Sequence, residues 1–454
     1  MVAGDQSDPV DVLILGGGPA GYVCALRSAQ NGRRVTLVDR ARLGGVCLNE
    51  GCIPSKQLAL FARAKANAER FASAGMPAFA GEPDLEAFQR SRGRAVDVLV
   101  KGVAGLLSGA GVTVISGSAW FVGRTRVCVA TGEESVRYFD FKDVVIATGS
   151  CAEPMPGMPF DGERIVEPAR ALEWTAAPSA LLVVGDDYVA LELAVAYARL
   201  GSRVTIATPG EKLLPDFDSD LSQAALRGAR GAGVEVLLSV DPSTIGSAFE
   251  RVVVSAGRRP NIADLHMTAA ALSPGTDQLT VDDQLRLDRH AYAIGDVTGP
   301  PLLAHRAMAQ GRVVGDILGG RAAAMDARAL PRVVFAEPEL ATVGLTEANA
   351  RETGADVAVG RFPLAALGRA VVEGSTSGFA KLLFARESGV LLGAHLAGPR
   401  ATDLIAELAL ALEMGATNED LALTMHAHPT LAEAAMEAAE VALGRPIHVR
   451  RPVR

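Results

Sequence analysis

Two cysteines separated by four residues are the part of the chain best suited to redox chemistry. Cys47 and Cys52 lie in the run GGVCLNEGCIPSK, which ends at Lys56. At this spacing the two thiols can lie about one helical turn apart and form a disulfide. A zinc ion would need two further ligands nearby, and none follows at metal spacing. We interpret the pair as redox-active thiols rather than inert core cysteines, and we predict no metal site.

A histidine and a glutamate near the C-terminus are the second candidates for chemistry. Pro429 follows His428, so Glu433 is expected in the first turns of a helix that begins after the histidine. Oxidising a dithiol requires a base that accepts a proton near neutral pH, and histidine has a suitable intrinsic pKa. A carboxylate bonded to the other ring nitrogen would fix the tautomer. In isolation this pattern would favour a histidine that caps a helix or packs in a core. Together with the cysteine motif upstream it predicts a catalytic pair, and we predict a structural role for His426.

The element that must position the cysteines is a glycine-rich turn between a strand and a helix. Residues 10–15 are a short apolar run typical of a buried parallel strand, residues 22–31 follow as a helix, and a second strand at 34–38 ends at Asp39. This is the required context of the dinucleotide-binding G-x-G-x-x-G pattern. The acid about 20 residues downstream favours this interpretation over a glycine-rich turn in an unrelated α/β domain. The residues of the turn are Gly16, Gly18, Pro19, Ala20 and Gly21.

Each glycine of the turn has a physical role in this interpretation. Gly16 permits the sharp turn, Gly18 lets a pyrophosphate approach the backbone, and Gly21 lets the helix and strand pack closely. The helix N-terminus would face the phosphates, and Asp39 would accept hydrogen bonds from the adenosine ribose. The pattern alone does not distinguish FAD from NAD.

The length, charge and cysteine count limit the classes of function. A chain of 454 residues exceeds one hydrophobic core and predicts about two to four domains. The net charge of −8 and the lack of a basic stripe argue against nucleic acid or an anionic membrane as a partner. No apolar run reaches the length of a membrane span and residues 1–10 lack a signal-peptide pattern, so we expect a cytoplasmic protein. Five cysteines are too few for a structural disulfide framework.

The chain resembles one known family at several separate motifs. The cysteine run is similar, almost residue for residue, to the redox-disulfide helix of the class I pyridine nucleotide–disulfide oxidoreductases, and of their dihydrolipoamide dehydrogenase-like members in particular. Glu50 is its unusual residue. The similarity continues at residues 147–150 (ATGS), 293–297 (AIGDV), 303–305 (LAH) and 426–433 (HAHPTLAE). It therefore spans nearly the whole chain.

The resemblance implies an α/β fold with two Rossmann-like dinucleotide-binding units and a C-terminal α/β dimerisation domain. The expected order is an FAD-binding domain (residues 1–153), a shortened NAD-binding-like domain (154–285), a return segment of the FAD-binding domain (286–328) and the dimerisation domain (329–454). A two-fold homodimer with two shared sites is implied, in which His428 reaches the active site of the other subunit.

The resemblance also implies roles for individual residues. Cys52 would lie against the flavin and exchange electrons with it, while Cys47 would react with the substrate. Lys56 would lie near the flavin N5 and pair with Glu192. Asp296 would bind the ribityl or phosphate region of the flavin. Further contacts with the cofactor are expected at Arg40, Gly45, Val46, Ala119, Thr148, Gly149, Ser150, Tyr188, Leu303, Ala304 and His305.

The second nucleotide-binding unit departs from the family pattern at three places. In the run GDDYVA at residues 185–190, Asp187 replaces the glycine that lets the backbone approach the pyrophosphate, and it adds a carboxylate facing the phosphates. Thr208 stands where an acid would hold the NAD ribose. Residues 240–250 are too short for the strand meander of relatives. We infer a unit kept for architecture with weakened NAD(P)H binding; the alternative is that Asp187 adapts locally and NADH still binds.

These observations predict an FAD-dependent dithiol–disulfide oxidoreductase that oxidises a dihydrolipoyl-type dithiol, either a small molecule or a lipoyl-carrying protein domain. The alternative is a repurposed flavoprotein that keeps the disulfide chemistry but passes electrons to oxygen, a quinone or a protein, or serves a specialised substrate. A catalytically silent scaffold is a third hypothesis, and the intact cysteine pair, Lys56 and the acid–base pair argue against it. FAD is the expected cofactor, and NAD is left open.

Overall fold

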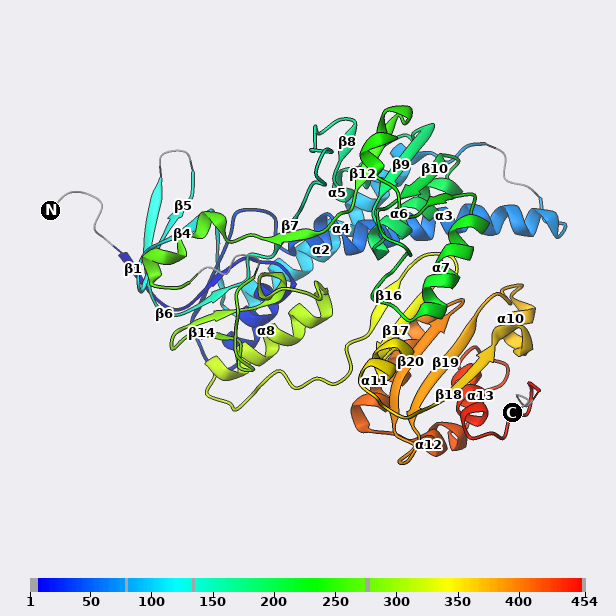
Figure 1. Cartoon of the computed structure of the whole chain (residues 1–454). Helices are drawn as coiled ribbons and strands as arrows, with labels where there is room; N and C mark the ends of the chain where they lie inside the picture. Colours follow the sequence, from blue (N-terminus) through cyan, green and yellow to red (C-terminus); the bar gives the residue numbers. More distant parts are fainter. Residues whose placement is uncertain (1–6, 78–80, 133–134, 274–277, 451–454) are drawn as a thin grey trace.

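The computed structural model describes residues 7–77, 81–132, 135–273 and 278–450 (Figure 1). Each of three parts of the chain is built around its own sheet of five or more strands. We call these parts the first unit, the second unit and the C-terminal domain. Their strands and helices lie within residues 7–152 together with 258–318, within 165–254, and within 332–442.

The first unit is an eight-stranded sheet in the order β14-β15-β6-β1-β2-β3, with β5 paired to β6 and β4 paired to β5. The strands from β15 to β3 run parallel. Val12 to Leu15 of β1 are almost fully buried, as expected of a parallel strand covered on both faces. The strands are β1 (Ser7–Leu15), β2 (Val35–Asp39), β3 (Thr113–Ser116), β4 (Ser118–Gly123), β5 (Arg126–Ala130), β6 (Val136–Ile146), β14 (Arg286–Asp288) and β15 (Ala291–Ala293).

Two glycines let the helix of the return segment pack closely on the first helix of the chain. A Cβ on Gly311 would lie 2.5 Å from the carbonyl oxygen of Ala20, and one on Gly315 would lie 2.6 Å from the Cβ of Arg27. The contact joins α8 to α1 and so fixes the return segment beside the glycine turn. The helices of this unit are α1 (Pro19–Gln30), α2 (Gly45–Asn49), α3 (Cys52–Ser73), α4 (Leu85–Gly109) and α8 (Ala304–Leu318).

The second unit is a five-stranded parallel sheet in the order β11-β10-β9-β12-β8. Residues 238–250 contain no strand and form two short 3-10 turns, in agreement with the expected absence of a meander. The elements are β8 (Ile165–Val166), α5 (Pro168–Ala171), β9 (Ala180–Val184), α6 (Tyr188–Arg199), β10 (Arg203–Ala207), α7 (Ser219–Gly231), β11 (Glu235–Leu237) and β12 (Arg251–Val254).

The two units are joined by a pair of antiparallel strands, β7 (Ser150–Ala152) and β13 (Arg258–Pro260). The chain returns to the first unit earlier than the sequence suggested. Residues 262–273 and 278–281 pack against the sheet of the first unit, where Leu265 and Met267 share a core with Leu13. Because this apolar cluster belongs to the first sheet, we propose that the second unit ends near residue 257 and not at 285.

The C-terminal domain is a five-stranded antiparallel sheet in the order β16-β17-β20-β19-β18. Helix α11 packs on β17 and β20, and α13 packs on β18 and β19. The strands are β16 (Arg332–Val334), β17 (Leu340–Gly344), β18 (Val357–Pro363), β19 (Phe379–Ala385) and β20 (Leu391–Ala397). The helices are α9 (Glu347–Glu352), α10 (Gly368–Val372), α11 (Ala401–Met414), α12 (Asn418–Leu423) and α13 (Glu433–Ala442).

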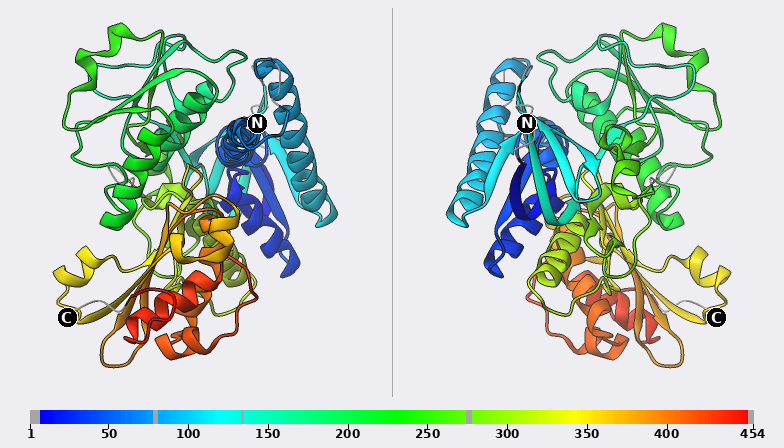
Figure 2. Two further views of the ribbon diagram at one scale, coloured as in Figure 1. Left: turned by 90° about the vertical axis from the view of Figure 1, so that its right-hand side faces the viewer. Right: turned by 90° about the vertical axis from the view of Figure 1, so that its left-hand side faces the viewer.

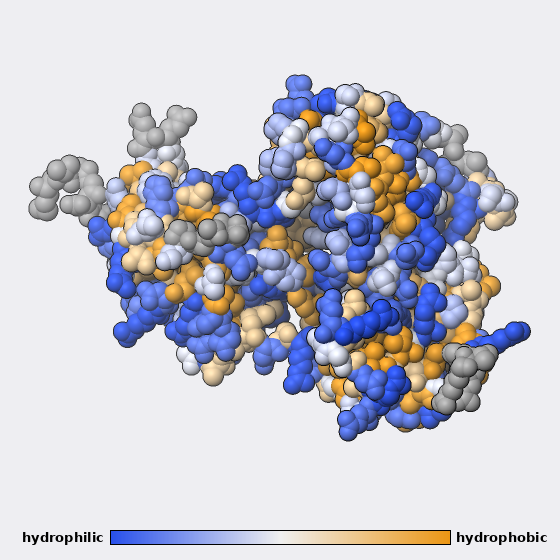
Figure 3. Space-filling model, viewed as in Figure 1, coloured by the Kyte–Doolittle hydropathy of each residue, from blue (hydrophilic) through white to orange (hydrophobic). Residues whose placement is uncertain are grey.

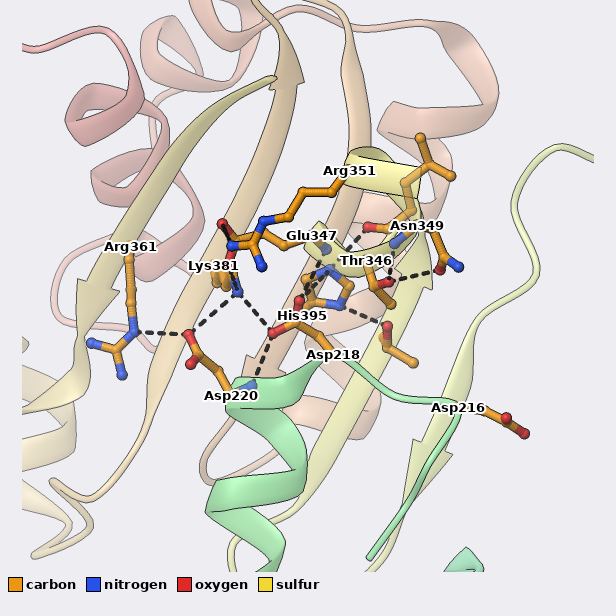
Figure 4. A network of polar contacts seen from close by, with 12 residues as sticks. Asp216, Asp218, Asp220, Thr346, Glu347, Asn349, Arg351, Arg361, Lys381 and His395 are labelled. Atoms are coloured by element: carbon orange, nitrogen blue, oxygen red, sulfur yellow. Dashed lines mark hydrogen bonds and ion pairs between the residues drawn. The ribbon is translucent and has the colours of Figure 1, made fainter. Parts of the chain in front are cut away.

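A buried ion network joins the second unit to the C-terminal domain (Figure 4). Lys381 of β19 is only 1% exposed, and its Nζ lies 2.8 Å from Asp218 Oδ1 and 2.6 Å from Glu347 Oε2. Asp218 caps α7 of the second unit, whereas Glu347 begins α9. Burial lowers the pKa of the adjacent His395 to about 4, so that ring is neutral near pH 7. The network therefore holds the Lys381 ammonium against carboxylates from both the second unit and the C-terminal domain.

The C-terminal domain also exposes large apolar side chains. Met414 at the end of α11 is 76% exposed and Met425, beyond α12, is 95% exposed. The space-filling view shows apolar surface on this domain (Figure 3). Contiguous apolar surface of this kind typically marks an interface with another protein chain. Among the described residues, no helix has the length and apolar character needed to cross a bilayer.

Candidate active site

The two cysteines lie at a junction of two helices and contact each other. Cys47 is in α2 and Cys52 is the first residue of α3. A hydrogen bond to Cys52, together with burial, raises the pKa of the Cys47 thiol. The same hydrogen bond lowers the pKa of Cys52; burial opposes this shift and the nearby Lys56 ammonium adds to it. Within the reduced pair, these shifts favour the proton on Cys47 and negative charge on Cys52.

The cation beside Cys52 is held by a buried carboxylate. Lys56 Nζ donates to Glu192 Oε2 at 2.8 Å, and Glu192 is only 4% exposed. The second oxygen of Glu192 accepts the backbone N–H of Phe335 at 2.9 Å, and the Phe335 ring lies 4.8 Å from Lys56 Nζ. The structure thus brings together Lys56 and Glu192, the pair that the sequence predicted. It places them where the first unit, the second unit and the C-terminal domain meet.

The glycine turn has the conformation that a bound pyrophosphate needs. Gly16 has a φ of +108°, and a Cβ there would lie 2.2 Å from the Ala147 carbonyl oxygen. A Cβ on Gly21 would lie 1.8 Å from the Gly16 oxygen, so neither position accepts a side chain. Gly18 caps α1 without any side-chain hydrogen bond, and a Cβ there would meet only the Gly45 Cα, at 3.8 Å. The N-terminus of α1 is therefore open to an anion.

Asp39 completes the first nucleotide site at the end of β2. Its carboxylate accepts the backbone N–H of Gly17 at 2.5 Å and that of Ala41 at 2.8 Å. Burial raises the pKa of Asp39, although these hydrogen bonds oppose the shift. The open helix terminus, the glycine turn and this carboxylate fit the pyrophosphate and ribose of FAD.

A loop and the return segment form a second group of cofactor candidates. Ser150 Oγ donates to Asp296 Oδ2 at 2.6 Å, and Gly149 has a φ of +71°. Arg258 donates to both the hydroxyl and the carbonyl oxygen of Ser150, each at 2.8 Å. Asn261 accepts from Thr148 Oγ1 through its backbone carbonyl at 2.7 Å. The sequence did not predict Arg258 and Asn261 as site residues.

The remaining candidate residues are distributed over the edge of the first unit. The side chain of Arg40 is exposed and lies 3.7 Å from the Asp264 carboxylate. A Cβ on Gly45 would lie 2.8 Å from the Gly18 Cα, so the start of α2 lies directly on the glycine turn. Burial lowers the pKa of His305. Val46 is exposed, Ala119 lies half-buried on β4, and Leu303 and Ala304 begin α8.

Tyr188 begins α6 close to the active cysteine. Burial raises its pKa, with further contributions from the charges of Asp187, Glu192 and Cys52. The phenol is therefore neutral at pH 7.

The acid–base pair of the C-terminal domain has the expected geometry. His428 Nδ1 lies 2.7 Å from Glu433 Oε1, and Glu433 is the first residue of α13. Burial raises the pKa of Glu433, but hydrogen bonds from His428 and from the Thr430 N–H outweigh it, so the net shift is downward. His426 differs, because its side chain is only 6% exposed and is held between Thr424 and Glu407.

Within one chain the acid–base pair and the cysteines lie in different domains. Figures 1 and 2 show α2 and α13 in separate parts of the molecule. The His428 side chain is 76% exposed and so is open to another molecule. A single chain therefore holds the thiols and the base apart.

Comparison with known proteins gives the class to which this fold and site belong. The family model described as pyridine nucleotide-disulphide oxidoreductase matches residues 10–311, and the model of its dimerisation domain matches residues 330–439. The chain belongs to the pyridine nucleotide–disulfide oxidoreductases, a family that uses FAD and NAD. The predicted family and fold class are confirmed.

Several similar proteins are dihydrolipoyl dehydrogenases. The chain is 40% identical over 471 residues to the dihydrolipoyl dehydrogenase of Bacillus subtilis (99% of this chain and 100% of the relative), and 38% identical over 473 residues to that of Halobacterium salinarum (99% of each). Among solved structures, LpdA from Mycobacterium tuberculosis has a TM-score of 0.87 at 26% identity, covering 95% of this chain and 99% of that one. The flavoprotein disulfide reductase RclA from Escherichia coli has a TM-score of 0.85 at 25% identity, covering 96% and 99%.

These comparisons confirm the predicted enzyme class. The protein is an FAD-dependent dithiol–disulfide oxidoreductase, and its dimerisation domain supports the predicted homodimer.

Proposed function

We propose that the protein oxidises a dihydrolipoyl-type dithiol through a Cys47–Cys52 disulfide that breaks and re-forms in each cycle. The observation that carries this proposal is the contact between the two thiols beside the Lys56–Glu192 ion pair; the hydrogen bond between the thiols raises the pKa of Cys47 and lowers that of Cys52. The sulfur with the lower pKa is the better leaving group in thiol–disulfide exchange. A substrate thiolate therefore attacks Cys47 and expels Cys52, whose charge Lys56 stabilises.

The dithiol half-reaction proceeds in two exchanges. One substrate thiol loses its proton and attacks Cys47, which breaks the Cys47–Cys52 bond and leaves Cys52 as a thiolate. The second substrate thiol loses its proton and attacks the substrate sulfur of the mixed disulfide, and Cys47 leaves and takes a proton. The substrate becomes a disulfide and its two electrons reside on the cysteine pair. When bound, FAD supplies the two-electron acceptor for that pair.

The base for these proton transfers is His428 of the partner subunit, oriented by Glu433. His428 is exposed and lies 2.7 Å from Glu433, and one chain does not bring this pair to the cysteines. The exposed apolar side chains of the C-terminal domain supply a surface on which a second copy can dock. A lipoyl group carried on a protein domain is the proposed form of the substrate, and the names of the relatives support it.

Anaerobic reduction of the FAD-loaded protein by dihydrolipoamide tests this proposal. Flavin absorbance of the wild type should bleach, whereas Cys47→Ser should remain oxidised over the same time. Cys128→Ser is a matched control, because Cys128 lies in β5 outside the site, and it should behave as the wild type does. A wild-type flavin that stays oxidised, or a Cys47→Ser protein reduced at the wild-type rate, would refute the assignment.

A further inference from the structure

The chain contains two strand–turn–helix segments of the dinucleotide-binding type. The residues that cap their helices can be compared directly. Gly18 before α1 has φ −70° and ψ −175°, and Asp187 before α6 has φ −81° and ψ 176°. Each follows a glycine of positive φ two residues earlier, Gly16 at +108° and Gly185 at +138°. The backbone of the second turn is therefore preserved. Only the side chains distinguish the two helix termini.

The second helix terminus is occupied by its own side chain. Asp187 Oδ1 accepts the backbone N–H of Ala190 at 2.8 Å, which is an N–H that would otherwise face a phosphate. Ser255, just after β12, donates its hydroxyl to Asp187 and lies 3.0 and 2.8 Å from the two oxygens. Gly18 has neither a carboxylate nor a side-chain cap. The Asp187 carboxylate thus stands where the first unit leaves room for an anion.

The ribose position of the second unit is also used internally. Asp39 of the first unit ends β2, whereas Thr208 follows β10 and donates its hydroxyl to Asp186 Oδ2 at 2.9 Å. The Thr208 hydroxyl also accepts the N–H of Gly210 at 3.0 Å. Asp186 and Asp187 thus stand where the first turn has Gly17 and Gly18, and they place two adjacent carboxylates there.

The ionisation of Asp187 is opposed mainly by its burial. Burial raises its pKa to about 6; the Ala190 N–H and Ser255 oppose that shift, and the neighbouring Asp186 charge adds to it. A pyrophosphate would bring further negative charge to the same position, at a cost that rises as water is excluded. The residues of the second unit do not fit NAD(H).

We propose that the Asp187 carboxylate takes the place of a dinucleotide pyrophosphate at the N-terminus of α6, so that the second unit does not bind NAD(H) at physiological concentrations. This inference goes beyond the proposed dithiol reaction and does not depend on it. It concerns which nucleotide the fold accepts, and it separates this chain from the NAD use of its family.

The test compares NADH binding to FAD-loaded wild type and Asp187→Gly by anaerobic titration calorimetry at pH 8. Glycine restores the first-unit cap and costs a helix N-cap only a few tenths of a kcal/mol, so the variant should fold. Wild type should show a dissociation constant above about 1 mM, and Asp187→Gly should bind at least about tenfold more tightly. The double variant Asp187→Gly/Thr208→Glu, which restores an acid after β10, should bind more tightly still.

Asp84→Gly is the matched control for loss of a helix cap. Asp84 caps α4 through the Ala87 N–H in the same manner but lies outside the second unit. Its NADH binding should equal that of the wild type. Micromolar binding by the wild type, or no gain in Asp187→Gly, would overturn the inference. Reduction of the same samples by dihydrolipoamide reports separately on the proposed function, because that reaction requires no nucleotide at α6.

Discussion

The ammonium of Lys56 in α3 and the carboxylate of Glu192 in α6 form an ion pair at 2.8 Å that links the two nucleotide-binding units beside the reactive thiols. Glu192 is buried, and its other oxygen is bonded to the backbone of Phe335. The positive charge next to Cys52 is therefore fixed by residues of two other domains. Stabilisation of the thiolate depends on how those domains pack.

Removing this ion pair should raise the pKa of Cys52. The comparison is Cys47→Ser with Cys47→Ser/Lys56→Met/Glu192→Gln, where loss of both partners leaves no unpaired buried charge. The midpoint of iodoacetamide alkylation should move to higher pH, with a fall of about tenfold in rate at pH 7 for each unit of pKa. Lys65→Met, which removes an ion pair with Glu69 farther along α3, is the control and should not move the midpoint. An unchanged midpoint in the triple variant would show that Lys56 does not stabilise the thiolate.

Mixed dimers should reveal whether the active site is shared. Cys47→Ser and His428→Gln homodimers should each be nearly inactive, because general acid–base catalysis contributes about 10²- to 10⁴-fold. A heterodimer of the two contains one site with both groups intact if the base comes from the partner. Co-expressed and doubly tagged heterodimers should therefore recover about half of the wild-type rate of dithiol oxidation. A base acting within its own chain predicts no recovery.

Asp187 should make stability depend on pH in a defined direction. Its folded pKa of about 6 lies above the ordinary 3.8, so the folded state holds the proton more tightly. The resulting stability is fully present below about pH 3.8 and is lost as the pH rises through about 6. Asp187→Asn keeps a good helix cap and cannot ionise. Urea unfolding should show it more stable than the wild type by about 1–2 kcal/mol at pH 8, and by about half as much at pH 5. An equal difference at both pH values would contradict this account.

Disrupting the buried Lys381 ion network should lower the free energy of unfolding substantially. Lys381→Met leaves Asp218, only 1% exposed, without its cation, and should reduce the free energy of unfolding by about 3–5 kcal/mol. Arg386 follows β19 and forms an exposed ion pair with Asp356, which serves as the control. Arg386→Met removes this pair and should lower the free energy of unfolding by about 0–1 kcal/mol. Thermal unfolding of both variants measures the difference. Similar losses would mean that burial does not set the energy of the network.

Local sequence patterns were sufficient to predict the first nucleotide site. The glycines, Asp39 and the cysteine pair lie within about 40 residues, and each follows from rules of turn and helix geometry that act over short spans. The contact between His428 and Glu433 was also predictable, because the two residues are only 5 positions apart in the sequence. These are the positions where a residue type and its spacing define the geometry.

Contacts between distant segments were not predictable in the same way. Arg258 reaches Ser150 across 108 residues, and the sequence did not predict it as a site residue. The return of residues 262–273 and 278–281 to the first sheet depends on apolar packing that has no regular period. Asp187 was identified as a departure, but its role as a cap was missed, although aspartate before a helix is a familiar N-cap signal.

Helix α6 has a consequence for how this protein can change during evolution. A domain that no longer holds a nucleotide would ordinarily tolerate mutation and eventual loss. Here the same helix carries Glu192, the carboxylate that anchors Lys56, so a deletion would remove the group that holds the Lys56 ammonium beside the thiols. Selection on disulfide chemistry would therefore preserve this helix even if the second unit bound no nucleotide.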